Sequence, residues 1–421
     1  SGIYLMRRVV IAGMIGNGLE WYDFALYGYF APVIGKLFFP ENNDVYIQML
    51  GTYGIFAAGF LLRPVGAVFF GFLGDKFGRK FSLALSIFLM AVPTACIGLL
   101  PTYQSIGIYA PILLLIMRLL QGLALAGQFS GSMAFLVEHA PKEKRALVGS
   151  SAVVSLCLGM LLGSLVATLF ARALSVEDFE SWGWRVPFIL GFAIALVGFY
   201  IRHHTEESPH YEKARDDGTL SKTPVRHAFQ GHFIELLRGV GIYLSVTVPF
   251  YTLTVFFNGF MISNLGLATK DAYFISTVSM ILMTISLPFF AHLTDVFGRK
   301  KILMPNALIY FVTAIPIFVL MSTGGFNQIF LSVIIFTIIT SCYISSVPAL
   351  LVELFPTSVR YTGMALSYNV AAVLGGFTPI IEHWLVKQGG NNMVASYIML
   401  CALISFISFI GYHDSYKEEL R

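Results

Sequence analysis

Residues 16–28 read Gly-Asn-Gly-Leu-Glu-Trp-Tyr-Asp-Phe-Ala-Leu-Tyr-Gly and lie inside the first long apolar run, residues 9–34. Glu20, Asp23 and Tyr27 are spaced i, i+3, i+7, which places them on one face of a helix. With a rise of about 1.5 Å per residue, Glu20 would lie roughly 17 Å deep, near the middle of a bilayer. A charge there costs about 2.5 to 3.5 kcal/mol, so the stretch predicts a functional site within the membrane. A carboxylate that merely reaches water from a helix end fits Glu20 poorly, while Asp23 could also be a structural partner.

The composition is that of a membrane protein. Of the 421 residues, 57% are hydrophobic and 12% are charged, whereas soluble proteins carry about 25% charged residues. The first apolar run is too long for a cleavable signal peptide and lacks a small-residue cleavage site after it. The four cysteines lie in apolar runs without close pairing, so we expect small hydrophobic residues there, not disulfides or metal ligands. The net charge of +4 is no indication of nucleic-acid binding.

Twelve apolar runs are long enough to span a bilayer. They lie near residues 9–34, 47–73, 81–101, 108–137, 146–171, 186–203, 239–262, 272–294, 302–322, 327–353, 361–386 and 393–413. The polar segment 204–238 divides them into two sets of six, which predicts bundles over 1–203 and 239–421 joined by a cytoplasmic linker. Most of the 27 Lys and Arg residues fall in loops on the side of the N-terminus, so we expect both termini in the cytoplasm.

The two halves of the chain repeat each other. Residues 71–80 read GFLGDKFGRK after the second run, and residues 291–300 read AHLTDVFGRK after the eighth. The pattern Glu-x2-Pro-x3-Arg follows the fourth run at Glu138 and the tenth at Glu353. Parallel six-helix repeats with a site between them are the architecture of alternating-access transporters. The sequence therefore predicts an all-α membrane transporter fold.

These motifs together resemble the major facilitator superfamily. The stretch at 16–28 further resembles the metabolite:proton symporter family, which includes proline/betaine, α-ketoglutarate, citrate and shikimate permeases. Around residues 96–117 and 353–386 the chain is most similar to the proline/betaine branch. Other matching stretches are Arg118-x2-Gln121-Gly122, residues 60–66 (FLLRPVG), 182–188 (WGWRVPF) and 355–361 (FPTSVRY). The resemblance covers essentially the whole chain. It implies two six-helix bundles and transport of a small organic solute with a proton.

One position departs from the resemblance. Relatives commonly carry GGEY where this chain has Ala126-Gly127-Gln128-Phe129. An amide replaces a titratable carboxylate at Gln128, so no proton role of that family position can operate here.

The N-terminal half is expected to bury two acids and two bases. Arg118, Gln121 and Gln128 share a face of one helix, and Arg63 lies near the middle of another. Unpaired ions would be prohibitively costly, so mutual pairing in a water-accessible cavity is expected. Protonation of Glu20 or Asp23 would then leave one positive charge, which favours a solute carboxylate. We expect Glu20 or Asp23 to carry the proton, with Arg118 as charge partner and Arg63 as a second anchor; a purely structural network is the alternative.

The middle of the C-terminal half contains no obvious ionisable group. Its polar candidates for solute contact are Tyr251, Asn258, Tyr343, Tyr368 and Asn369, beside Tyr27, Arg63, Arg118, Gln121 and Gln128 from the first half. Aromatic faces could hold a quaternary ammonium by cation–π attraction. For any single one of the second-half residues, packing and helix–helix hydrogen bonds are the simpler interpretation. Gly159 and Gly163, a G-x3-G pair, are expected to permit close helix packing.

The repeated loop motifs are interpreted as gates. The candidate residues are Asp75, Arg79, Glu138, Arg145, Asp295, Arg299, Glu353 and Arg360. We expect Asp75 to accept at a helix N-terminus or to pair with Arg79 or Arg145. Asp295 with Arg299 and Glu353 with Arg360 would repeat this in the other half. If the motifs served only to set the orientation of the loops in the membrane, their basic residues would be explained, but the matched acidic residues would not.

The leading hypothesis is proton-coupled symport that imports a small zwitterion such as betaine or proline, or an organic acid. A uniporter or exchanger for the same solutes is the alternative, motivated by Gln128, and a transporter-derived receptor or scaffold is a third. No metal-ligand spacing, nucleotide loop or nucleophile elbow indicates an enzyme, a metal or another cofactor. We expect a monomer in a bacterial inner membrane, whose partners are the solute, the proton and the lipid.

Overall fold

The computed structural model describes residues 2–42, 45–204, 208–221, 224–257, 260–261, 264–267 and 269–421, together with most of their side chains. Helices make up nearly all of these ranges, and no strand occurs in them. The structure forms two compact units. Unit 1 comprises Ser1–His139, Val154–Val225 and Thr357–Ala365, and unit 2 comprises Ala140–Val153, Arg226–Pro356 and Leu366–Arg421.

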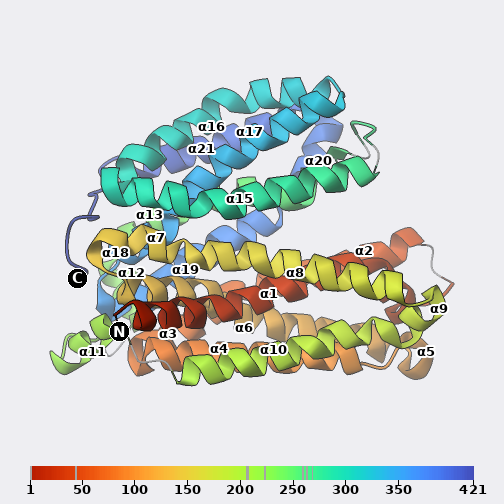
Figure 1. Ribbon diagram of the computed structural model, residues 1–421, viewed down its shortest axis with the longest axis horizontal. Coiled ribbons are helices and arrows are strands. Elements are labelled where there is room, and N and C mark those ends of the chain that lie inside the picture. Colours follow the sequence, from red (N-terminus) through yellow and green to blue (C-terminus); the bar gives the residue numbers. More distant parts are fainter. Residues whose placement is uncertain are drawn as a thin grey trace. The chain divides into compact units, whose positions relative to one another are not determined.

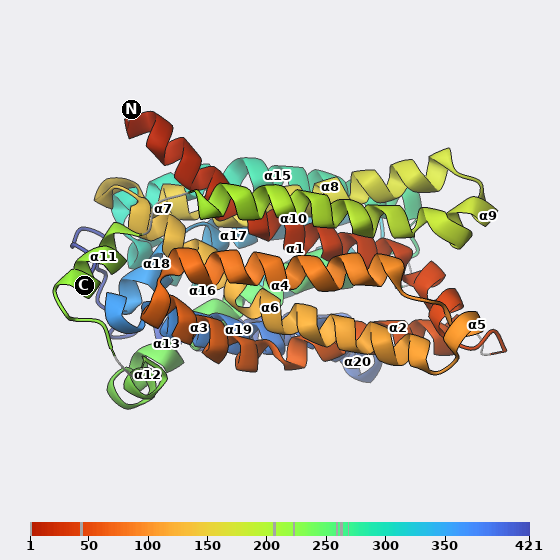
Figure 2. The same cartoon turned by 90° about the horizontal axis from the view of Figure 1, so that it is seen from below.

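Unit 1 is built from the helices of the first half of the chain. They are α1 (Gly2–Phe38), α2 (Val45–Leu61), α3 (Arg63–Phe77), α4 (Arg79–Leu99), α5 (Tyr103–Ile106), α6 (Tyr109–His139), most of α8 (Ser151–Ala173), α9 (Val176–Asp178), the π-helix η2 (Phe179–Gly183), α10 (Arg185–His203) and α11 (Pro209–Asp216). Figures 1 and 2 show α4 running beside α10, and α4 also packs on α6. Because α1 packs on α6, α10 and α2, its apolar faces are enclosed by unit 1.

Unit 2 holds the helices of the second half. They are α13 (Phe233–Tyr251), the π-helix η3 (Thr252–Phe256), α15 (Thr269–Phe297), α16 (Arg299–Ser322), α17 (Phe326–Ser345), α18 (Val347–Leu354), α19 (Arg360–Gly376), α20 (Thr378–Gly389) and α21 (Asn392–Ser408). Within it α16 packs on α17 and α21, and α13 packs on α21. The short helix α12 (Pro224–Gly231) contains the boundary between the units.

Each half of the chain contributes a short segment to the other unit. The turn η1 (Lys142–Lys144) and helix α7 (Arg145–Gly149) belong to unit 2 and pack on α15 and α18. The turn η4 (Thr357–Val359) and the start of α19 belong to unit 1, where η4 packs on α3 and α11. The two compact units do not coincide with residues 1–203 and 239–421, because each unit includes a segment from the other half of the chain. The bundle boundaries at residues 203 and 239 therefore stay a prediction.

All twelve predicted runs coincide with described helices, and several of them are broken. Proline occupies the first turn of α3, α18 and α20, directly after the breaks at Leu62, Ser346 and Phe377. Proline lacks the N–H that would continue the preceding helix, so it favours a new helix start. The run at 239–262 changes to the π-helix η3 shortly after Pro249.

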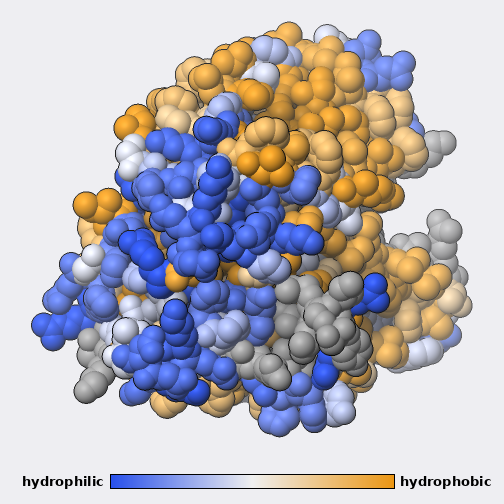
Figure 3. Space-filling view, turned by 60° about the vertical axis from the view of Figure 1, so that its left-hand side comes forward, coloured by the Kyte–Doolittle hydropathy of each residue, from blue (hydrophilic) through white to orange (hydrophobic). Residues whose placement is uncertain are grey.

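Length and apolar composition qualify seven helical stretches of the described chain as candidate membrane spans, or eight if the bent pair Val176–Gly183 and Arg185–Tyr200 counts as one. Large hydrophobic side chains are exposed along them, among them Leu165, Ile285 and Val312. Figure 3 shows hydrophilic residues gathered over the centre and lower left of the view, while hydrophobic residues cover its upper right. The chain is a multi-pass membrane protein.

Two glycines of α8 bring this helix close to α1, as the G-x3-G pair predicts. A methyl group at Gly159 would collide with the backbone of Gly18, and one at Gly163 would lie 2.7 Å from the Cβ of Ala25. Small residues permit such close helix packing in membranes. The contacts fix α1 on both sides of Glu20 and Asp23.

Candidate functional site

Helix α1 carries two buried carboxylates that pair with arginines from two other helices. The Oε1 of Glu20 lies 3.5 Å from Nη2 of Arg63, and the Oδ2 of Asp23 lies 3.2 Å from Nη1 of Arg118. All four side chains are at most 6% exposed. Arg63 is the first residue of α3, directly after the break at Leu62. The pairing expected from the sequence is present, with one arginine for each acid.

A glutamine and a threonine complete the surroundings of Asp23. Gln121 donates from Nε2 to Asp23 Oδ2 at 3.0 Å and to Thr94 Oγ1 at 3.0 Å. Arg118 in turn donates from Nη1 to Gln121 Oε1 at 2.7 Å. One oxygen of Asp23 is therefore held by α6, which is itself anchored to α4.

Aromatic rings lie against both arginines. The guanidinium of Arg118 is 4.7 Å from the centre of the Tyr27 ring, and that of Arg63 is 4.6 Å from the centre of the Phe60 ring. Cation–π contacts of this kind stabilise a desolvated guanidinium and hold its plane in one orientation. Tyr27 thus lies beside these charged groups, about two turns from Glu20 and about one turn from Asp23 on the same helix. We refer to Glu20, Asp23, Arg63, Arg118 and Gln121 as the mid-helix cluster.

The mid-helix cluster has spare hydrogen-bonding capacity. Within the described part of the chain, Oε2 of Glu20 and Oδ1 of Asp23 are buried and have no hydrogen-bond partner. With both acids ionised the two acids and two arginines sum to zero charge. The arrangement can therefore take up a proton on a carboxylate, or a donor group of a ligand, without first losing an existing bond.

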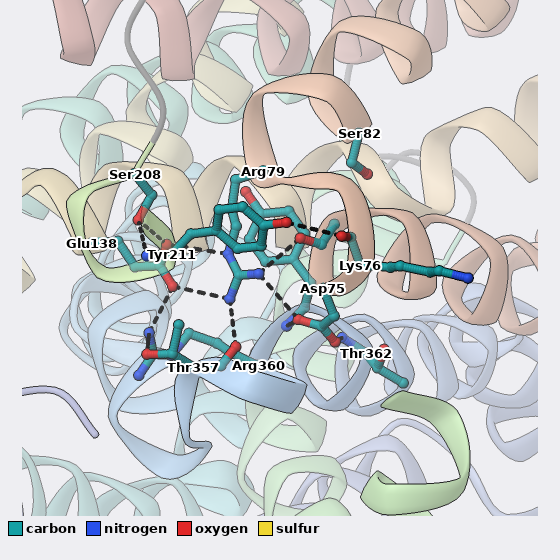
Figure 4. A network of polar contacts seen from close by, with 12 residues as sticks. Asp75, Lys76, Arg79, Ser82, Glu138, Ser208, Tyr211, Thr357, Arg360 and Thr362 are labelled. Atoms are coloured by element: carbon teal, nitrogen blue, oxygen red, sulfur yellow. Dashed lines mark hydrogen bonds and ion pairs between the residues drawn. The ribbon is translucent and has the colours of Figure 1, made fainter. Parts of the chain in front are cut away.

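A second group of charges lies where α3 ends and α4 begins. Arg79 donates to both oxygens of Glu138 at 3.2 Å each and to Asp75 Oδ1 at 3.3 Å. Its remaining contacts are the carbonyl oxygens of Gly74 and Thr357, each at 2.8 Å. Glu138 and Asp75 lie on opposite sides of the Arg79 guanidinium (Figure 4).

Segments from elsewhere in the sequence enclose Arg79. Arg360 donates to Glu138 Oε1 at 2.6 Å, and the Ser208 hydroxyl donates to Glu138 Oε2. The ring of Tyr211, from α11, lies 5.0 Å from the Arg79 guanidinium, as Figure 4 shows. We call the set Asp75, Arg79, Glu138 and Arg360 the Arg79 cluster.

Asp75 binds the start of α19 through the backbone. Its Oδ1 accepts from the Tyr361 N–H at 3.0 Å and its Oδ2 from the Thr362 N–H at 2.8 Å. The N-terminus of a helix presents free N–H groups and a positive dipole end, so a carboxylate is well placed there. Two of the three expected interactions of Asp75 are therefore present, the helix N-terminus and Arg79, while Arg145 lies in unit 2.

Unit 2 contains the counterpart of this arrangement, the Arg299 cluster of Asp295, Arg299, Glu353 and Arg145. Arg299 donates to the two oxygens of Glu353 at 3.1 Å each and to Asp295 Oδ1 at 2.9 Å. Arg145 Nη1 lies 3.3 Å from Glu353 Oε2. Asp295 accepts from two backbone N–H groups of α7, at residues 146 and 147.

The expected pairing of Glu353 with Arg360 is wrong. Arg360 bonds Glu138 of unit 1, while Glu353 bonds Arg299 and Arg145. The repeat explains the difference: each Glu pairs with the Arg of its own unit's Gly-Arg-Lys motif and with an Arg brought in from the other half of the sequence.

The second-half candidates for solute contact are buried side chains of unit 2. Tyr343 donates its hydroxyl to the Ile242 carbonyl at 2.6 Å, which links two helices. Tyr368 stacks edge-on against Tyr243, with ring centres 5.1 Å apart, and Tyr251 and Asn369 are buried as well. Asn258 and the side chain of Gln128 lie outside the described residues.

Sequence analysis missed one acid. Glu382, in α20, is completely buried and bonds Thr252 of η3. The prediction named no obvious ionisable group in the middle of this half, and Glu382 was not among its candidates. The residue stands four positions before the end of the predicted run 361–386, where a carboxylate reads as a helix-end residue. A carboxylate inside any apolar run was the signal that could have found it.

Comparison with known proteins agrees with the motifs. The family model for the Major Facilitator Superfamily matches residues 14–379 and, in a second match, 239–418. The proline/betaine transporter of Salmonella typhimurium is 33% identical, over 99% of this chain and 85% of the relative. The glycine betaine/proline/ectoine/pipecolic acid transporter of Dickeya dadantii is 34% identical, with the same coverage of both chains.

A solved structure shares the fold. The proton:xylose symporter XylE superposes with a TM-score of 0.80, covers 100% of this chain and 98% of its own, and is 17% identical. At that identity the likeness concerns the fold alone. The family match and the full-length relatives decide the assignment: the chain belongs to the major facilitator superfamily and is a membrane transporter of small solutes, not an enzyme.

Proposed function

We propose that this protein imports a small organic solute together with a proton, by alternating access. The solute is a zwitterion such as betaine or proline, or an organic acid. The protein acts as a monomer in a bacterial inner membrane with both termini in the cytoplasm. The names of the full-length relatives support the solute class, and the excess of Lys and Arg on one set of loops supports the orientation.

The observation that carries the proton coupling is the mid-helix cluster. Two acids and two arginines are buried together, and each acid keeps one oxygen without a described hydrogen-bond partner. A proton on Glu20 or Asp23 leaves the cluster with one net positive charge in a low-dielectric setting. A solute carboxylate would neutralise that charge. Proton and solute therefore stabilise each other's binding, which is the thermodynamic requirement for symport.

Arg118 is the residue we propose for the solute carboxylate. Its Nε is buried, its Nη1 already bonds Asp23 and Gln121, and Tyr27 covers one side of its plane. Protonation of Asp23 weakens the ion pair at 3.2 Å and releases part of the guanidinium for another anion. Tyr251 and Tyr368 stay candidates for contact with an ammonium group through their aromatic rings.

The Arg79 and Arg299 clusters are the proposed gates. In each cluster an Asp binds the N-terminal backbone of a helix from the other half of the sequence. Opening of the cytoplasmic side would have to break these bonds. The free energy required to break these hydrogen bonds stabilises the closed state of the cytoplasmic side, and solute binding would have to offset it.

Uptake into proteoliposomes tests the proposal. Purified protein is reconstituted, and uptake of radiolabelled glycine betaine, proline, 2-oxoglutarate, citrate and shikimate is followed with an inward proton gradient and without one. We expect one solute class to accumulate against its gradient only when the proton gradient is imposed, and a protonophore to abolish the accumulation. Liposomes without protein are the control.

A specific observation favours a second candidate, uniport or exchange of the same solutes. The family resemblance implies a carboxylate at the position where this chain has Gln128, and an amide at this position cannot titrate. Uniport predicts equal internal and external solute at equilibrium, whatever the pH gradient. Accumulation that survives a protonophore and follows only a countersubstrate would identify an exchanger instead, and would contradict the proton coupling.

A further inference from the structure

Unit 2 contains a buried carboxylate that the proposed mechanism does not use. Glu382 is the fifth residue of α20 and has no exposed surface. Among the described side chains it forms no ion pair. A buried acid without a counter-ion is costly when ionised, so such a residue inside a membrane protein indicates a function.

The hydrogen bonds of Glu382 indicate which protonation state it has. Its Oε1 lies 2.7 Å from the hydroxyl oxygen of Thr252, which in turn lies 2.8 Å from the carbonyl oxygen of Val248. A threonine hydroxyl has one proton and can donate only once. Both short contacts are satisfied together if Glu382 is protonated and donates to Thr252, which then donates to Val248. An ionised Glu382 would leave one of the two contacts without a proton.

The rest of the surroundings fits a neutral acid. Oε2 of Glu382 is buried without a hydrogen-bond partner in the described chain. The titratable groups that face it are Tyr397 and Cys401 of α21, both neutral in their ordinary state. Among the described side chains of η3, Thr252 is its hydrogen-bond partner, and on α20 itself the side chains of His383 and Lys387 are outside the described residues. No described group around Glu382 supplies a positive charge.

Two interrupted helices meet at this residue. α20 begins after the break at Phe377, and it packs on η3, where the helix that began as α13 turns into a π-helix. Irregular backbone at membrane depth occurs where it is buried in protein or lines a cavity, and interrupted helices of transporters commonly carry ion sites. π-helical turns are likewise frequent at functional sites. The acid thus lies between two interrupted stretches of helix.

We propose that Glu382 is a second proton-binding site of the transporter, separate from the mid-helix cluster and loaded with a proton in the state described here. It releases that proton when the backbone around η3 and α20 rearranges and admits water, and takes up another in the return step. If transport is proton-coupled, as proposed above, the consequence is that a second proton moves with each solute molecule. This consequence rests on the proposed function. Thr252 is the positioning residue, because it orients the acid through its hydroxyl.

Infrared difference spectroscopy tests the protonation state directly. Spectra of the wild type and Glu382→Gln, which keeps the size of the side chain, are recorded in reconstituted membranes in H2O and D2O at neutral pH. We expect the wild type to show the carbonyl-stretch band of a protonated carboxylic acid, shifted by D2O, and the variant to lack it. The same band should move in Thr252→Val, which removes the hydroxyl and leaves the acid. Identical spectra of wild type and Glu382→Gln in this region would overturn the proposal.

Proton counting tests the transport role. The number of protons that enter with each solute molecule is measured in proteoliposomes with an entrapped pH-sensitive dye and radiolabelled solute. We expect Glu382→Gln to transport solute with a lower proton-to-solute ratio than the wild type, and Thr252→Val to keep the wild-type ratio at a lower rate. An unchanged ratio in Glu382→Gln would overturn the proposal even if the acid band is present. A wild type that moves no protons would instead contradict the proposed function, while the infrared result would still decide the protonation state.

Discussion

The mid-helix cluster and the Arg79 cluster are both buried and both pair acids with arginines, yet they differ in how completely the acids are bonded. Asp75 and Glu138 have partners on all four carboxylate oxygens. Glu20 and Asp23 each bond through one oxygen, and the other has no partner among the residues the structure describes. Burial alone is therefore not what separates the two clusters.

The difference in bonding assigns different roles. A fully bonded ion cluster resists a change of protonation, because a proton on either acid would break an existing bond. An acid with a free oxygen can take up a proton or a ligand at lower cost. The Arg79 cluster thus suits a gate that holds segments together, and the mid-helix cluster suits a site that exchanges protons and binds solute.

The largest effect is expected from breaking the fully bonded cluster. Glu138→Gln leaves Arg79 and Arg360 buried without the carboxylate they share. Removing one partner from a buried ion network costs about 3–5 kcal/mol, so the thermal unfolding midpoint in detergent should fall strongly. Glu180→Gln is the matched control, because its pair with Lys36 is exposed (59% and 28% for Lys36 and Glu180) and is worth about 0–1 kcal/mol. Equal midpoints for the two variants would contradict the gate assignment.

The twin cluster in unit 2 should respond less. Glu353→Gln removes the same bidentate contact to Arg299, but the second arginine is farther away, at 3.3 Å for Arg145 against 2.6 Å for Arg360. In the described part of the chain, no hydroxyl donates to Glu353 as the Ser208 hydroxyl donates to Glu138. We expect destabilisation smaller than in Glu138→Gln by about 1 kcal/mol, measured in the same unfolding experiment. If Glu353→Gln lost more stability than Glu138→Gln, the number of bonds made by each glutamate would not determine how strongly its cluster stabilises the fold.

A substitution in the mid-helix cluster should change solute binding more than stability. Arg118→Lys keeps the charge and loses the planar contacts to Gln121 and Tyr27. We expect the apparent affinity for the solute to fall about tenfold, which corresponds to about 1.4 kcal/mol, in uptake assays at varied solute concentration. Arg185→Lys is the control, since Arg185 also stacks on a ring, that of Trp184, but bonds backbone carbonyls. Wild-type affinity in Arg118→Lys would remove Arg118 from the solute site.

The smallest effect is expected at the edge of the Arg79 cluster. Tyr211→Phe keeps the ring over Arg79 and removes only the hydroxyl that donates to the Lys76 carbonyl at 2.9 Å. The loss of one such bond costs about 0.5–1.5 kcal/mol. The unfolding midpoint should fall slightly, and transport should stay at the wild-type rate. Loss of transport with an unchanged midpoint would show that α11 acts in the cycle itself.

Much of the fold follows from the sequence, because apolar runs of membrane-spanning length have few alternatives to helices. The breaks at Leu62, Ser346 and Phe377 are also readable, since a proline follows each within two residues. The pairing of Glu20 and Asp23 with Arg63 and Arg118 was predictable from the free-energy cost of burying unpaired charges, because buried charges require partners.

Other features depend on contacts that no local pattern encodes. The repeat shows that Glu138 and Glu353 are equivalent, but it does not say which of Arg145 and Arg360 each one bonds, and the structure crosses them over. Glu382 was missed for a different reason, because a carboxylate four positions before the end of an apolar run reads as a helix-end residue, and its burial against Thr252 is a tertiary contact.

The most direct test of the account is the response of Asp23→Asn to a proton gradient. Counterflow of solute, which needs binding and the conformational cycle but no net proton movement, is compared with accumulation driven by an imposed pH gradient. We expect Asp23→Asn and Glu20→Gln each to retain counterflow and to lose gradient-driven accumulation, while the control Glu180→Gln retains both. Unchanged gradient-driven accumulation in both cluster variants would contradict proton coupling through the mid-helix cluster.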